Sequence, residues 1–368
     1  MTVVHVFSGD LWAGAEVMIA HLLTDLQRRP GLRVIALSLN EGTLTERLRR
    51  AGLQTHVVPE AGRPFARLVV EAARLLRSER GAILHAHRYK ENLLAWLVGR
   101  WLGARAVVTT LHGLDDPGVH EPHASASRRA RIRLNRLLVR RGFTCAVAVS
   151  DEMRATLVER LGFAADRVEV IRNGVPVPAE RRADRFGRPP RVGSVGRLVP
   201  VKGFELAVAI AAALRHDPGN VRMSILGEGP LRPALLGRAR ALGLDETFEL
   251  CAPRDDPGPF YRALDVYLST SRHEGMPLSV LEAMAWATPV VAPRVGGIPE
   301  AVTDGAEGFL IDGRDPEAFA ARCRLLLADP ALRRSMGARA RERVRVAFSV
   351  EAMGEAYLKL YERCGGGR

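Results

Sequence analysis

Two glutamates, Glu274 and Glu282, flank the start of a predicted helix in the segment 269–300. Pro277 suits the first turn of that helix, because proline lacks the backbone N–H that would have no helical partner there. Ionised carboxylates only accept hydrogen bonds, so the two side chains could grip two parts of a polyhydroxylated ligand such as a sugar. The structural alternative is that Ser279 and Glu282 form a capping box and that Glu274 is merely exposed.

The backbone at the same helix start is a second candidate binding element. The first N–H groups of a helix have no partner within it, and here they belong to the stretch around Gly275, Met276 and Leu278, next to Pro277. Such groups favour negative charge, so the stretch could bind an anion or a hydroxyl group.

A basic loop that contains glycine follows the first predicted strand of the second half of the chain. Glycines at such a turn let phosphate approach the backbone, while arginine and lysine supply complementary charge. Lysine occupies only three of the 54 basic positions, so a lysine in this loop favours a point-charge contact to phosphate over a solvated surface residue. The residues concerned are Gly193, Gly196, Arg197, Lys202 and Gly203.

Two further strand-to-helix turns carry glycine. Gly227 and Gly229 follow a predicted strand, where a backbone could meet a nucleotide, although a plain turn explains these glycines nearly as well. In the first half, Gly14 and Glu16 lie at the turn between the first strand and the first helix.

Histidines are concentrated in the first half of the chain. His112 directly follows a predicted strand, at the edge where parallel sheets bind ligands, so it could make a polar or acid-base contact to a hydroxyl group; the alternative is a structural histidine. His85 and His87 form one short pair and His120 and His123 another, with spacings that metal ligands can have. No pattern of acidic ligands accompanies them, so the sequence predicts no metal site and no cofactor.

The segment 127–142 contains seven arginines interleaved with isoleucine and leucine. As a helix it would be basic and amphipathic, which is compatible with binding to an anionic membrane surface. A solvated helix on a globular surface explains the pattern equally well. Aromatic residues make up only 5% of the chain and no nucleic-acid motif is present, so we predict no nucleic-acid partner.

These residues mostly follow short apolar runs, which alternate with amphipathic stretches along the chain. Strands that alternate with helices predict an α/β fold with doubly wound parallel sheets covered on both faces. The alternation restarts at 191–198, after a proline-rich stretch, 175–190, that is typical of a linker. We therefore predict one domain over 1–178 and a second over 179–349, with ligands bound at the strand ends that border an interdomain cleft.

Length and composition fit this organisation. A chain of 368 residues suits two domains, and its 47% hydrophobic and 26% charged residues exclude disordered, collagen-like and multi-span membrane classes. Four widely separated cysteines indicate neither a disulfide framework nor a zinc knuckle. The formal charge of +13 suits nucleic acid, a phosphorylated substrate or an anionic membrane surface, and composition alone does not choose among them. The start of the chain lacks a signal-peptide pattern, which predicts a cytoplasmic protein that could also bind the inner face of the cell membrane peripherally.

Taken in their order along the chain, these motifs resemble those of the retaining glycosyltransferases of family 4. The resemblance is densest over 191–315 and includes the run 289–319. That family has the GT-B fold: two facing Rossmann-like domains with an interdomain cleft and a C-terminal helix that crosses back onto the first domain. The resemblance implies that the first domain, joined by a final helix at about 350–368, binds the acceptor. The second domain would bind a nucleotide-sugar donor.

The resemblance also implies roles for individual residues. Arg197 and Lys202 would neutralise the donor diphosphate, Glu274 would hold the donor sugar, Glu282 would hold the ribose, and His112 would lie near the acceptor hydroxyl. The other donor-binding positions would be Gly14, Gly227, Gly229, Gly275, Met276, Pro277 and Leu278.

The chain departs from the family's pattern at three places. The usual glycine pair of the first turn is Ala13 and Gly14, and Ala287 occupies a position where glycine is usual. Cys251 and Ala252 replace the glycine that usually follows their strand. None of these departures removes a charged position assigned above.

The implied activity is transfer of a sugar, with retention of configuration, from a UDP- or GDP-sugar to a sugar, lipid-linked or polysaccharide acceptor. The expected setting is the synthesis of a bacterial surface polysaccharide or glycolipid, and two cations at the diphosphate would make a metal unnecessary. Two alternatives belong to other classes: a sugar-nucleotide epimerase of similar fold, which needs no acceptor, and a non-catalytic regulator that binds polysaccharide or lipid.

Overall fold

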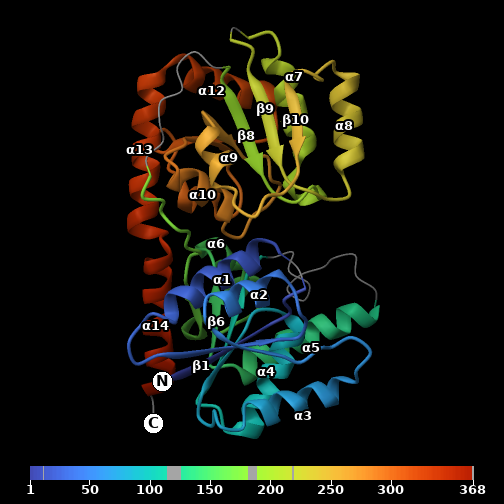
Figure 1. Cartoon of the computed structure of the whole chain (residues 1–368), viewed down its shortest axis with the longest axis vertical. Helices are drawn as coiled ribbons and strands as arrows, with labels where there is room; N and C mark the ends of the chain where they lie inside the picture. Colours follow the sequence, from blue (N-terminus) through green and yellow to red (C-terminus); the bar gives the residue numbers. More distant parts are fainter. Residues whose placement is uncertain (11, 114–125, 181–188, 218, 367–368) are drawn as a thin grey trace. The chain divides into compact units, whose positions relative to one another are not determined.

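The computed structural model of the protein describes residues 1–10, 12–113, 126–180, 189–217 and 219–366. The chain forms two compact units: the first is Met1–Gly174 with Val350–Arg368, and the second is Val175–Ser349 (Figure 1). The boundary predicted from the sequence lies at residue 178. Among the described residues, no helix is long and apolar enough to cross a membrane.

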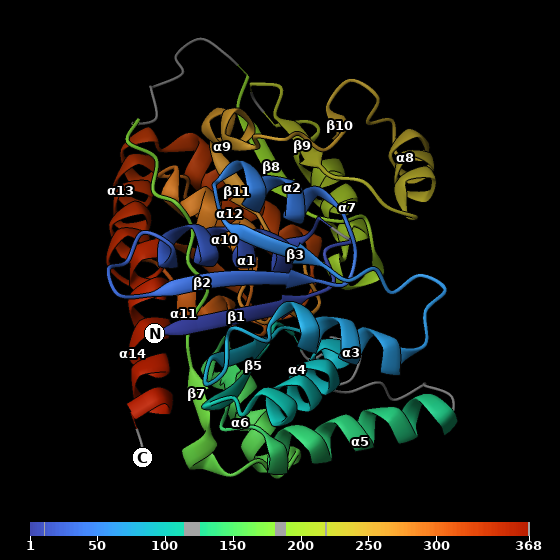
Figure 2. The ribbon, with the colours of Figure 1, turned by 60° about the horizontal axis from the view of Figure 1, so that its bottom comes forward.

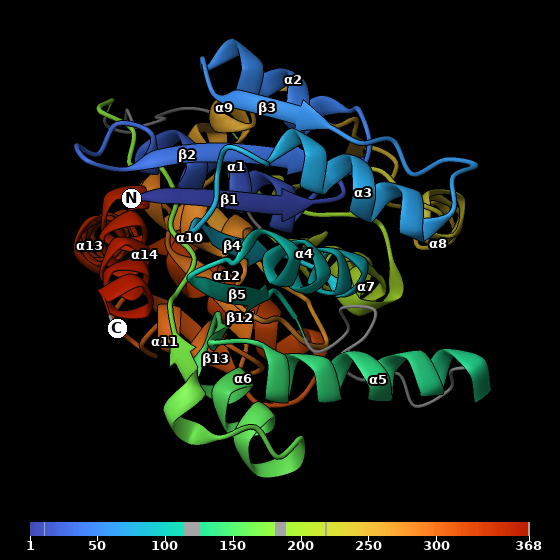
Figure 3. The same cartoon turned by 90° about the horizontal axis from the view of Figure 1, so that it is seen from below.

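The first unit is built on a seven-stranded parallel sheet in the order β3-β2-β1-β4-β5-β6-β7, and Figure 3 shows β3, β2, β1, β4 and β5 in this succession. Val3, Val4 and Val6 of β1 have no exposed surface, whereas the residue between the last two, His5, is polar and equally buried. The strands are β1 (Thr2–Phe7), β2 (Arg33–Ser38), β3 (Gln54–Val57), β4 (Ile83–Ala86), β5 (Ala106–Leu111), β6 (Cys145–Ala148) and β7 (Val168–Val170).

Helices connect these strands, and the last helix of the chain belongs to the same unit, as the resemblance implies. Arg29, which follows α1, bonds Asp25 of α1 at 2.8 Å and Glu355 of α14 at 2.7 Å, so that ion pairs join the two helices. The helices are α1 (Gly14–Leu26), α2 (Thr43–Arg50), α3 (Phe65–Leu75), α4 (Tyr89–Leu102), α5 (Ala126–Gly142), α6 (Asp151–Ala155) and α14 (Val350–Gly366), with a π-helical turn at Thr156–Arg160 and a 3-10 turn at Ala165–Arg167.

The second unit has a six-stranded parallel sheet in the order β10-β9-β8-β11-β12-β13. Phe204 and Phe319, from two different helices, are buried in its core. The strands are β8 (Arg191–Val195), β9 (Arg222–Leu226), β10 (Phe248–Cys251), β11 (Val266–Leu268), β12 (Val290–Pro293) and β13 (Gly308–Ile311).

Helices of the second unit begin with strong sequence signals. Asp315 and Asp329 each precede a proline, and each carboxylate accepts from two backbone N–H groups of the helix that follows. The helices are α7 (Phe204–Leu214), α8 (Arg232–Ala241), α9 (Gly258–Ala263), α10 (Leu278–Ala285), α11 (Ile298–Ala301), α12 (Pro316–Ala328) and α13 (Pro330–Ala347), with a 3-10 turn, η3, at Pro200–Lys202.

Each sheet reverses its strand order at one point, between β1 and β4 in the first unit and between β8 and β11 in the second. Doubly wound sheets bind ligands at such switch points, at the carboxyl ends of the strands. The loops that follow β8 and β11, and those that follow β1, β4 and β5, are therefore the places to look for chemistry.

Candidate active site

The switch point of the second unit brings Lys202 and Glu274 into contact. Lys202 ends the turn η3 in the loop after β8, and Glu274 lies in the loop between β11 and α10. The Lys202 Nζ is 2.5 Å from Glu274 Oε1, and the Ser271 hydroxyl donates to the same oxygen at 2.6 Å. The lysine predicted for phosphate is thus ion-paired to the glutamate predicted for sugar, and each is only partly accessible, at 22% and 13% of its side-chain surface.

Backbone hydrogen bonds tie these two loops together. The Arg272 N–H donates to the Val201 carbonyl at 2.8 Å, and the Thr270 hydroxyl donates to the Lys202 carbonyl at 3.0 Å. Arg314, from the loop after β13, donates to the Thr270 carbonyl at 2.9 Å. The position of Lys202 is therefore set by its own backbone and does not depend on the ion pair alone.

The loop after β12 holds the backbone of Glu274. The Gly297 N–H donates to the Glu274 carbonyl at 3.0 Å. Gly296 has a φ of +56°, and a Cβ at this position would lie only 1.8 Å from the same carbonyl oxygen, so glycine is required for the close approach. The glycine pair at 296–297 was not assigned a role from the sequence, because its partner is a backbone atom more than twenty positions away.

Glu282 lies on α10, where the Tyr261 hydroxyl donates to its Oε2 at 2.5 Å. Burial raises the pKa of Glu282 to about 7, although the hydrogen bond from Tyr261 acts in the opposite direction. The proposed capping box is wrong: α10 has Pro277 as its N-cap, without a side-chain cap, so Ser279 is already inside the helix. The burial of Glu282 therefore does not result from capping of α10.

Arg197 is exposed, and no hydrogen bond or ion pair to its side chain is found among the described residues. It lies in the same loop as Lys202. One of the two cations predicted for phosphate is therefore unneutralised, while the other is paired.

The loop after β9 packs directly on the loop after β8. A Cβ at Gly227 would lie 1.9 Å from the Gly196 carbonyl oxygen, and the Leu198 N–H donates to the Glu228 carbonyl at 2.8 Å. Gly227 thus has a structural function in joining the two loops, and Gly229 likewise lies against the backbone of Leu198.

At the start of α10, the side chains of Met276 and Leu278 are 4% and 8% exposed. Gly275 and Pro277 are buried as well. Because these side chains are occupied in packing, only the backbone of this stretch could meet a ligand, as the prediction requires.

In the first unit, the loop after β1 leads to an ion pair at the start of α1. The Arg88 guanidinium lies 2.5 Å from Glu16 Oε1, and the other carboxylate oxygen accepts from the Ala13 N–H at 3.2 Å. Burial raises the pKa of Glu16, and the charge of Arg88 opposes that shift. Gly14 begins α1, with nothing within 4 Å of the place where a side chain would start.

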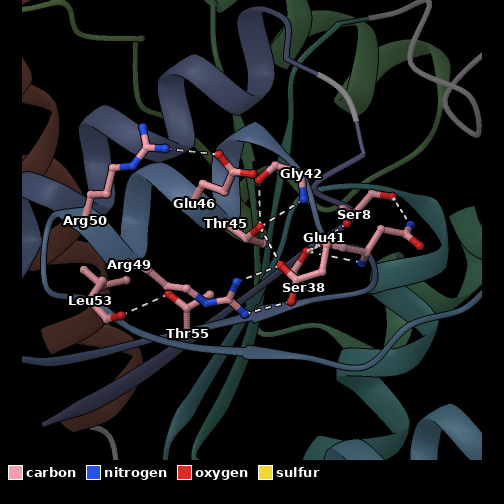
Figure 4. A network of polar contacts seen from close by, with 11 residues as sticks. Ser8, Ser38, Glu41, Gly42, Thr45, Glu46, Arg49, Arg50, Leu53 and Thr55 are labelled. Carbon is pink, nitrogen blue, oxygen red and sulfur yellow. Dashed lines mark hydrogen bonds and ion pairs between the residues drawn. The ribbon is translucent and has the colours of Figure 1, made fainter.

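The loops after β1 and β2 are held by a polar network, which Figure 4 shows. The Ser38 hydroxyl donates to the Ser8 carbonyl at 2.8 Å, and the two nitrogens of Arg49 bond Glu41 at 2.7 and 2.9 Å. The Gly42 N–H donates to Thr45 at the start of α2. This network fixes the strand ends of the first unit next to the turn that carries Glu16.

His112 follows β5, as predicted, and is partly buried. Its Nε2 lies 3.3 Å from His87 Nδ1, and burial, aided by the charge of Arg88, lowers the pKa of His112 to about 3. His5 was missed by the sequence analysis, yet its ring lies against His85 of β4 and against His87, which directly follows that strand. The other pair of histidines considered for a metal, at positions 120 and 123, lies outside the described residues.

The basic helix predicted at 127–142 is α5, which runs alongside α4 in Figure 2. Ile132 and Val139 are buried against the unit, whereas Leu134 and Leu137 are 59% and 42% exposed. The apolar residues of this helix are therefore divided between the core and the surface.

Comparisons with known proteins identify the family. A family model described as glycosyl transferases group 1 matches residues 189–329, and one described as glycosyltransferase family 4 matches residues 12–177. The D-inositol 3-phosphate glycosyltransferase of Corynebacterium efficiens is 32% identical over 313 residues, which are 77% of this chain and 73% of that protein. LpsE, a lipopolysaccharide core biosynthesis glycosyltransferase of Rhizobium meliloti, is 35% identical over 211 residues, 56% of this chain and 61% of that protein.

Solved structures share the fold over nearly the whole chain. HepE from Anabaena, in complex with UDP and glucose, has a TM-score of 0.85 at 19% identity and covers 98% of this chain and 99% of its own. Sucrose-phosphate synthase from Thermosynechococcus elongatus has a TM-score of 0.81 at 20% identity, with 99% of each chain covered. With its two doubly wound parallel sheets and a relative 32% identical over most of its length, this chain belongs to the group 1 and family 4 glycosyltransferases and has their GT-B fold.

Proposed function

We propose that this glycosyltransferase moves a sugar from a nucleotide-diphospho-sugar to an acceptor hydroxyl with retention of configuration. The observation that carries the proposal is the contact between Lys202 and Glu274 at the switch point of the second unit, beside the exposed Arg197. Cations and a carboxylate are what a diphospho-sugar requires, the first for its phosphates and the second for its hydroxyl groups. Structural relatives determined with UDP and with UDP-glucose support a nucleotide-sugar as the donor.

In this proposal the ion pair exchanges partners when the donor binds. The diphosphate attracts Lys202, and Glu274 turns its free oxygen to the hydroxyl groups of the sugar. Arg197, which has no partner to give up among the described residues, adds the second positive charge. Preorganised cations stabilise the charge that develops on the leaving diphosphate, which is commonly the largest contribution to catalysis.

The nucleotide would be held by groups around the same loops. Glu282 would accept from the ribose hydroxyls, and the backbone near Gly227, Gly229 and Gly275 would approach the nucleotide and phosphates. Gly14 in the first unit, at the exposed start of α1, would contribute a further phosphate contact.

The acceptor would be bound by the first unit, with His112 close to the attacking hydroxyl. The relatives named above act, by their names, on D-inositol 3-phosphate and on the lipopolysaccharide core. The name of LpsE supports an acceptor in the synthesis of a bacterial surface polysaccharide or glycolipid, whereas the name of the first relative would fit a small phosphorylated acceptor. The product's anomeric configuration, read by proton NMR, tests retention directly.

The first experiment is a thermal-shift panel with UDP, GDP, ADP and their sugars. A ligand that binds only the folded protein adds about 2.7 kcal/mol of stability at a hundredfold excess over its dissociation constant. We expect one nucleotide to raise the melting temperature, and expect the shift to disappear in Lys202→Met. No shift with any nucleotide would make a non-catalytic regulator the better interpretation, and conversion of the donor without an acceptor would indicate an epimerase.

We also propose that no divalent metal takes part in transfer, since Arg197 and Lys202 both lie beside the presumed diphosphate site. Turnover that survives dialysis against a chelator is the expected result. Loss of transfer in the chelator and its recovery with added Mg²⁺ or Mn²⁺ would contradict this part of the proposal.

A second part of the proposal concerns membranes. The exposed Leu134 and Leu137 of α5 lie among Arg133, Arg140 and Arg141, which are exposed as well. Exposed apolar side chains with flanking cations favour an interfacial position on anionic lipid. Reversing the charge of the three arginines is expected to lower sedimentation with phosphatidylglycerol vesicles, with the same number of reversals on α13, at Arg334, Arg339 and Arg345, as the control.

A further inference from the structure

A continuous series of hydrogen bonds leads from His112 into the interior of the first unit. It joins four histidines, a threonine and two tyrosines. They lie on β1, β4, β5 and α14, except for His87 and His112, which directly follow β4 and β5. The contacts are His112 Nε2 to His87 Nδ1 at 3.3 Å, His87 Nε2 to His5 Nδ1 at 3.0 Å, His5 Nε2 to the Tyr361 hydroxyl at 3.2 Å, the Tyr361 hydroxyl to His85 Nδ1 at 2.6 Å, His85 Nε2 to the Thr110 hydroxyl at 2.8 Å, and the Thr110 hydroxyl to the Tyr357 hydroxyl at 2.8 Å.

The groups in this series are neutral. Burial lowers the pKa of His5 to about 3 and holds the pKa values of His85 and His87 well below the ordinary range. Burial raises the pKa values of Tyr357 and Tyr361, so both keep their hydroxyl protons. A neutral imidazole has one N–H donor and one acceptor nitrogen, and each hydroxyl has one proton. Every contact in the series is therefore a hydrogen bond with one proton. Each group must accept from the neighbour on one side and donate to the neighbour on the other, in the same order along the whole series, if each proton is to have an acceptor.

The inner end of the series fixes that direction. Thr110 is the hydrogen-bond partner of the Tyr357 hydroxyl within the described part of the chain, and Tyr357 is 1% exposed. A buried hydroxyl proton without an acceptor is costly, so Tyr357 donates to Thr110. Thr110 must then donate to His85 Nε2, which places the proton of His85 on Nδ1, where it donates to Tyr361. Tyr361 in turn donates to His5 Nε2.

The same rule fixes the donors of the remaining hydrogen bonds, from His5 to His112. His5 has its proton on Nδ1 and donates to His87 Nε2, and His87 has its proton on Nδ1 and donates to His112 Nε2. The proton of His112 is left on Nδ1. No described residue bonds this nitrogen.

The geometry of the rings does not favour a metal at the same place, although the ligand atoms of His5, His85 and His87 lie within 4.8 Å of one another. Imidazole lone pairs lie in the ring plane, and the His85 and His87 rings are stacked face to face at 4.4 Å and 27°, so their lone pairs do not converge. The planes of the His5 and His87 rings are nearly parallel, at 18°, with their nitrogens 3.0 Å apart. This is hydrogen-bond geometry, because two nitrogens each about 2.1 Å from a tetrahedral metal would be about 3.4 Å apart.

We propose that Tyr361, His5 and His87 are positioning residues that hold His112 in the tautomer with its proton on Nδ1, so that His112 offers the substrate a hydrogen-bond donor and not a base. In the transfer reaction His112 would then donate to an oxygen of the donor sugar or acceptor, while the acceptor proton leaves with the diphosphate. That catalytic consequence rests on the proposed function, whereas the tautomer itself does not.

The test is NMR of the full chain with 15N-labelled histidine, which distinguishes Nδ1–H from Nε2–H in each ring. We expect Nδ1–H in His5, His85, His87 and His112, against the preference of free imidazole side chains for Nε2–H. Nε2–H at His112 in the wild-type protein would overturn the proposal. So would the replacement of ring N–H signals by zinc-bound signals when one equivalent of Zn²⁺ is added.

Two tyrosine variants on α14 distinguish an effect of the hydrogen-bond series from an effect of packing. Tyr361→Phe removes the hydroxyl that accepts from His85 and donates to His5. His5 is then no longer held in one tautomer, so His112 is expected to lose its pure Nδ1–H signal. Tyr357→Phe removes an equally buried hydroxyl at the end of the series, but Thr110 can still donate to His85, so the His112 signal is expected to stay unchanged.

An unchanged His112 in Tyr361→Phe contradicts the proposal, and if that variant does not fold, the wild-type spectrum alone decides. If the tautomers are as expected and His112→Ala retains full transfer, the role assigned to His112 under the proposed function fails while the tautomer inference stands.

Discussion

At the scale of single residues, the contact between Lys202 and Glu274 gives the two charges of the proposed donor site a partner in the free protein. Each side chain is largely removed from water, and an unpaired charge in such a place is destabilising. In the free protein, each of the two side chains therefore has the other as its partner, where the proposed function would give it a group of the donor. A site of this kind is held in shape while empty and has to give up one ion pair when it binds.

This arrangement predicts different outcomes for single and double variants. Lys202→Met leaves Glu274 unpaired and is expected to lower the free energy of unfolding by about 1–3 kcal/mol, whereas Lys202→Met with Glu274→Gln recovers much of that loss. Turnover is expected to fall by about 10²–10³ in both. Urea unfolding and initial rates measure the two effects.

The control for this cycle is the pair of Lys90 and Glu60, at 2.9 Å, whose lysine is 60% exposed. Exposed pairs contribute about 0–1 kcal/mol, so Lys90→Met should change neither stability nor turnover appreciably. If Lys202→Met behaved like Lys90→Met, the half-buried pair of Lys202 and Glu274 would have no special function.

Glu282 predicts a pH dependence of donor binding. Its pKa is raised to about 7, so the free protein carries a mixture of the neutral and ionised forms near neutral pH. Ribose hydroxyls donate to the ionised form, so affinity is expected to be highest above pH 7 and to fall by about tenfold per pH unit once the pH is well below 7. Calorimetric titration of the nucleotide between pH 5.5 and 8.5 measures this slope, which Glu282→Gln should abolish; a slope that persists in the variant would assign the titration to another group.

At the scale of elements, the sequence predicts which segments are strands and helices better than it predicts their contacts. The helix α7, Phe204–Leu214, is marked in the sequence by a run of apolar residues after Gly203. Tyr261 is different: nothing near it in sequence indicates that it bonds Glu282, because that contact depends on how α9 packs against α10. Local patterns specify elements, whereas the partners of buried polar groups are set by packing over long distances in sequence.

The end of α10 shows what one departure from the family pattern does. Ala287 has a φ of +56°, and the hydrogen bonds from Ala287 N–H to Met284 and from Thr288 N–H to Ala283 form a Schellman motif. The position that glycine usually occupies in this motif therefore carries a side chain in the left-handed conformation, which costs about 1–2 kcal/mol.

Ala287→Gly is expected to raise the free energy of unfolding by up to about 1 kcal/mol, since relief of that strain is offset in part by the greater freedom of glycine in the unfolded chain. Ala338, exposed in the middle of α13, is the matched control, where the same replacement should cost about 1 kcal/mol. Urea denaturation of both variants gives the comparison. Equal losses in the two would mean that Ala287 is not strained.

At the scale of the whole molecule, the two units differ in the buried groups that they leave uncharged. The first unit contains five histidines with lowered pKa values, His5, His21, His85, His87 and His112, and one glutamate with a raised pKa, Glu16, whereas the second contains Glu282 with a raised pKa. The sequence shows the histidines but gives no sign that β1, β4 and α14 bring two of them, His5 and His85, against Tyr361, because residues more than 270 positions apart meet there. Only the strand order and the return of α14 bring them together.

This difference predicts that acid affects the units in opposite ways. Unfolded histidines take up protons as the pH falls through about 6.5, while the buried ones do not, so each removes up to about 1.4 kcal/mol of first-unit stability per pH unit below that value. Glu282 binds its proton in the folded state at about pH 7 and in the unfolded state only near 4.5, so it adds stability to the second unit as the pH falls between those values. Between pH 7.5 and 5 the first unit should therefore lose stability relative to the second.

The tryptophans allow the units to be followed separately, since Trp286 is in the second unit and Trp12, Trp96 and Trp101 are in the first. Urea unfolding at pH 7.5 and 5 is read by fluorescence in a variant that keeps Trp286 alone and in the complementary variant Trp286→Phe. The first-unit midpoint should fall on acidification while the Trp286 midpoint holds or rises, and Glu282→Gln should remove any rise. Parallel falls of both midpoints would show that the buried histidines are not what makes the first unit sensitive to acid, because the second unit has no comparable set among its described residues.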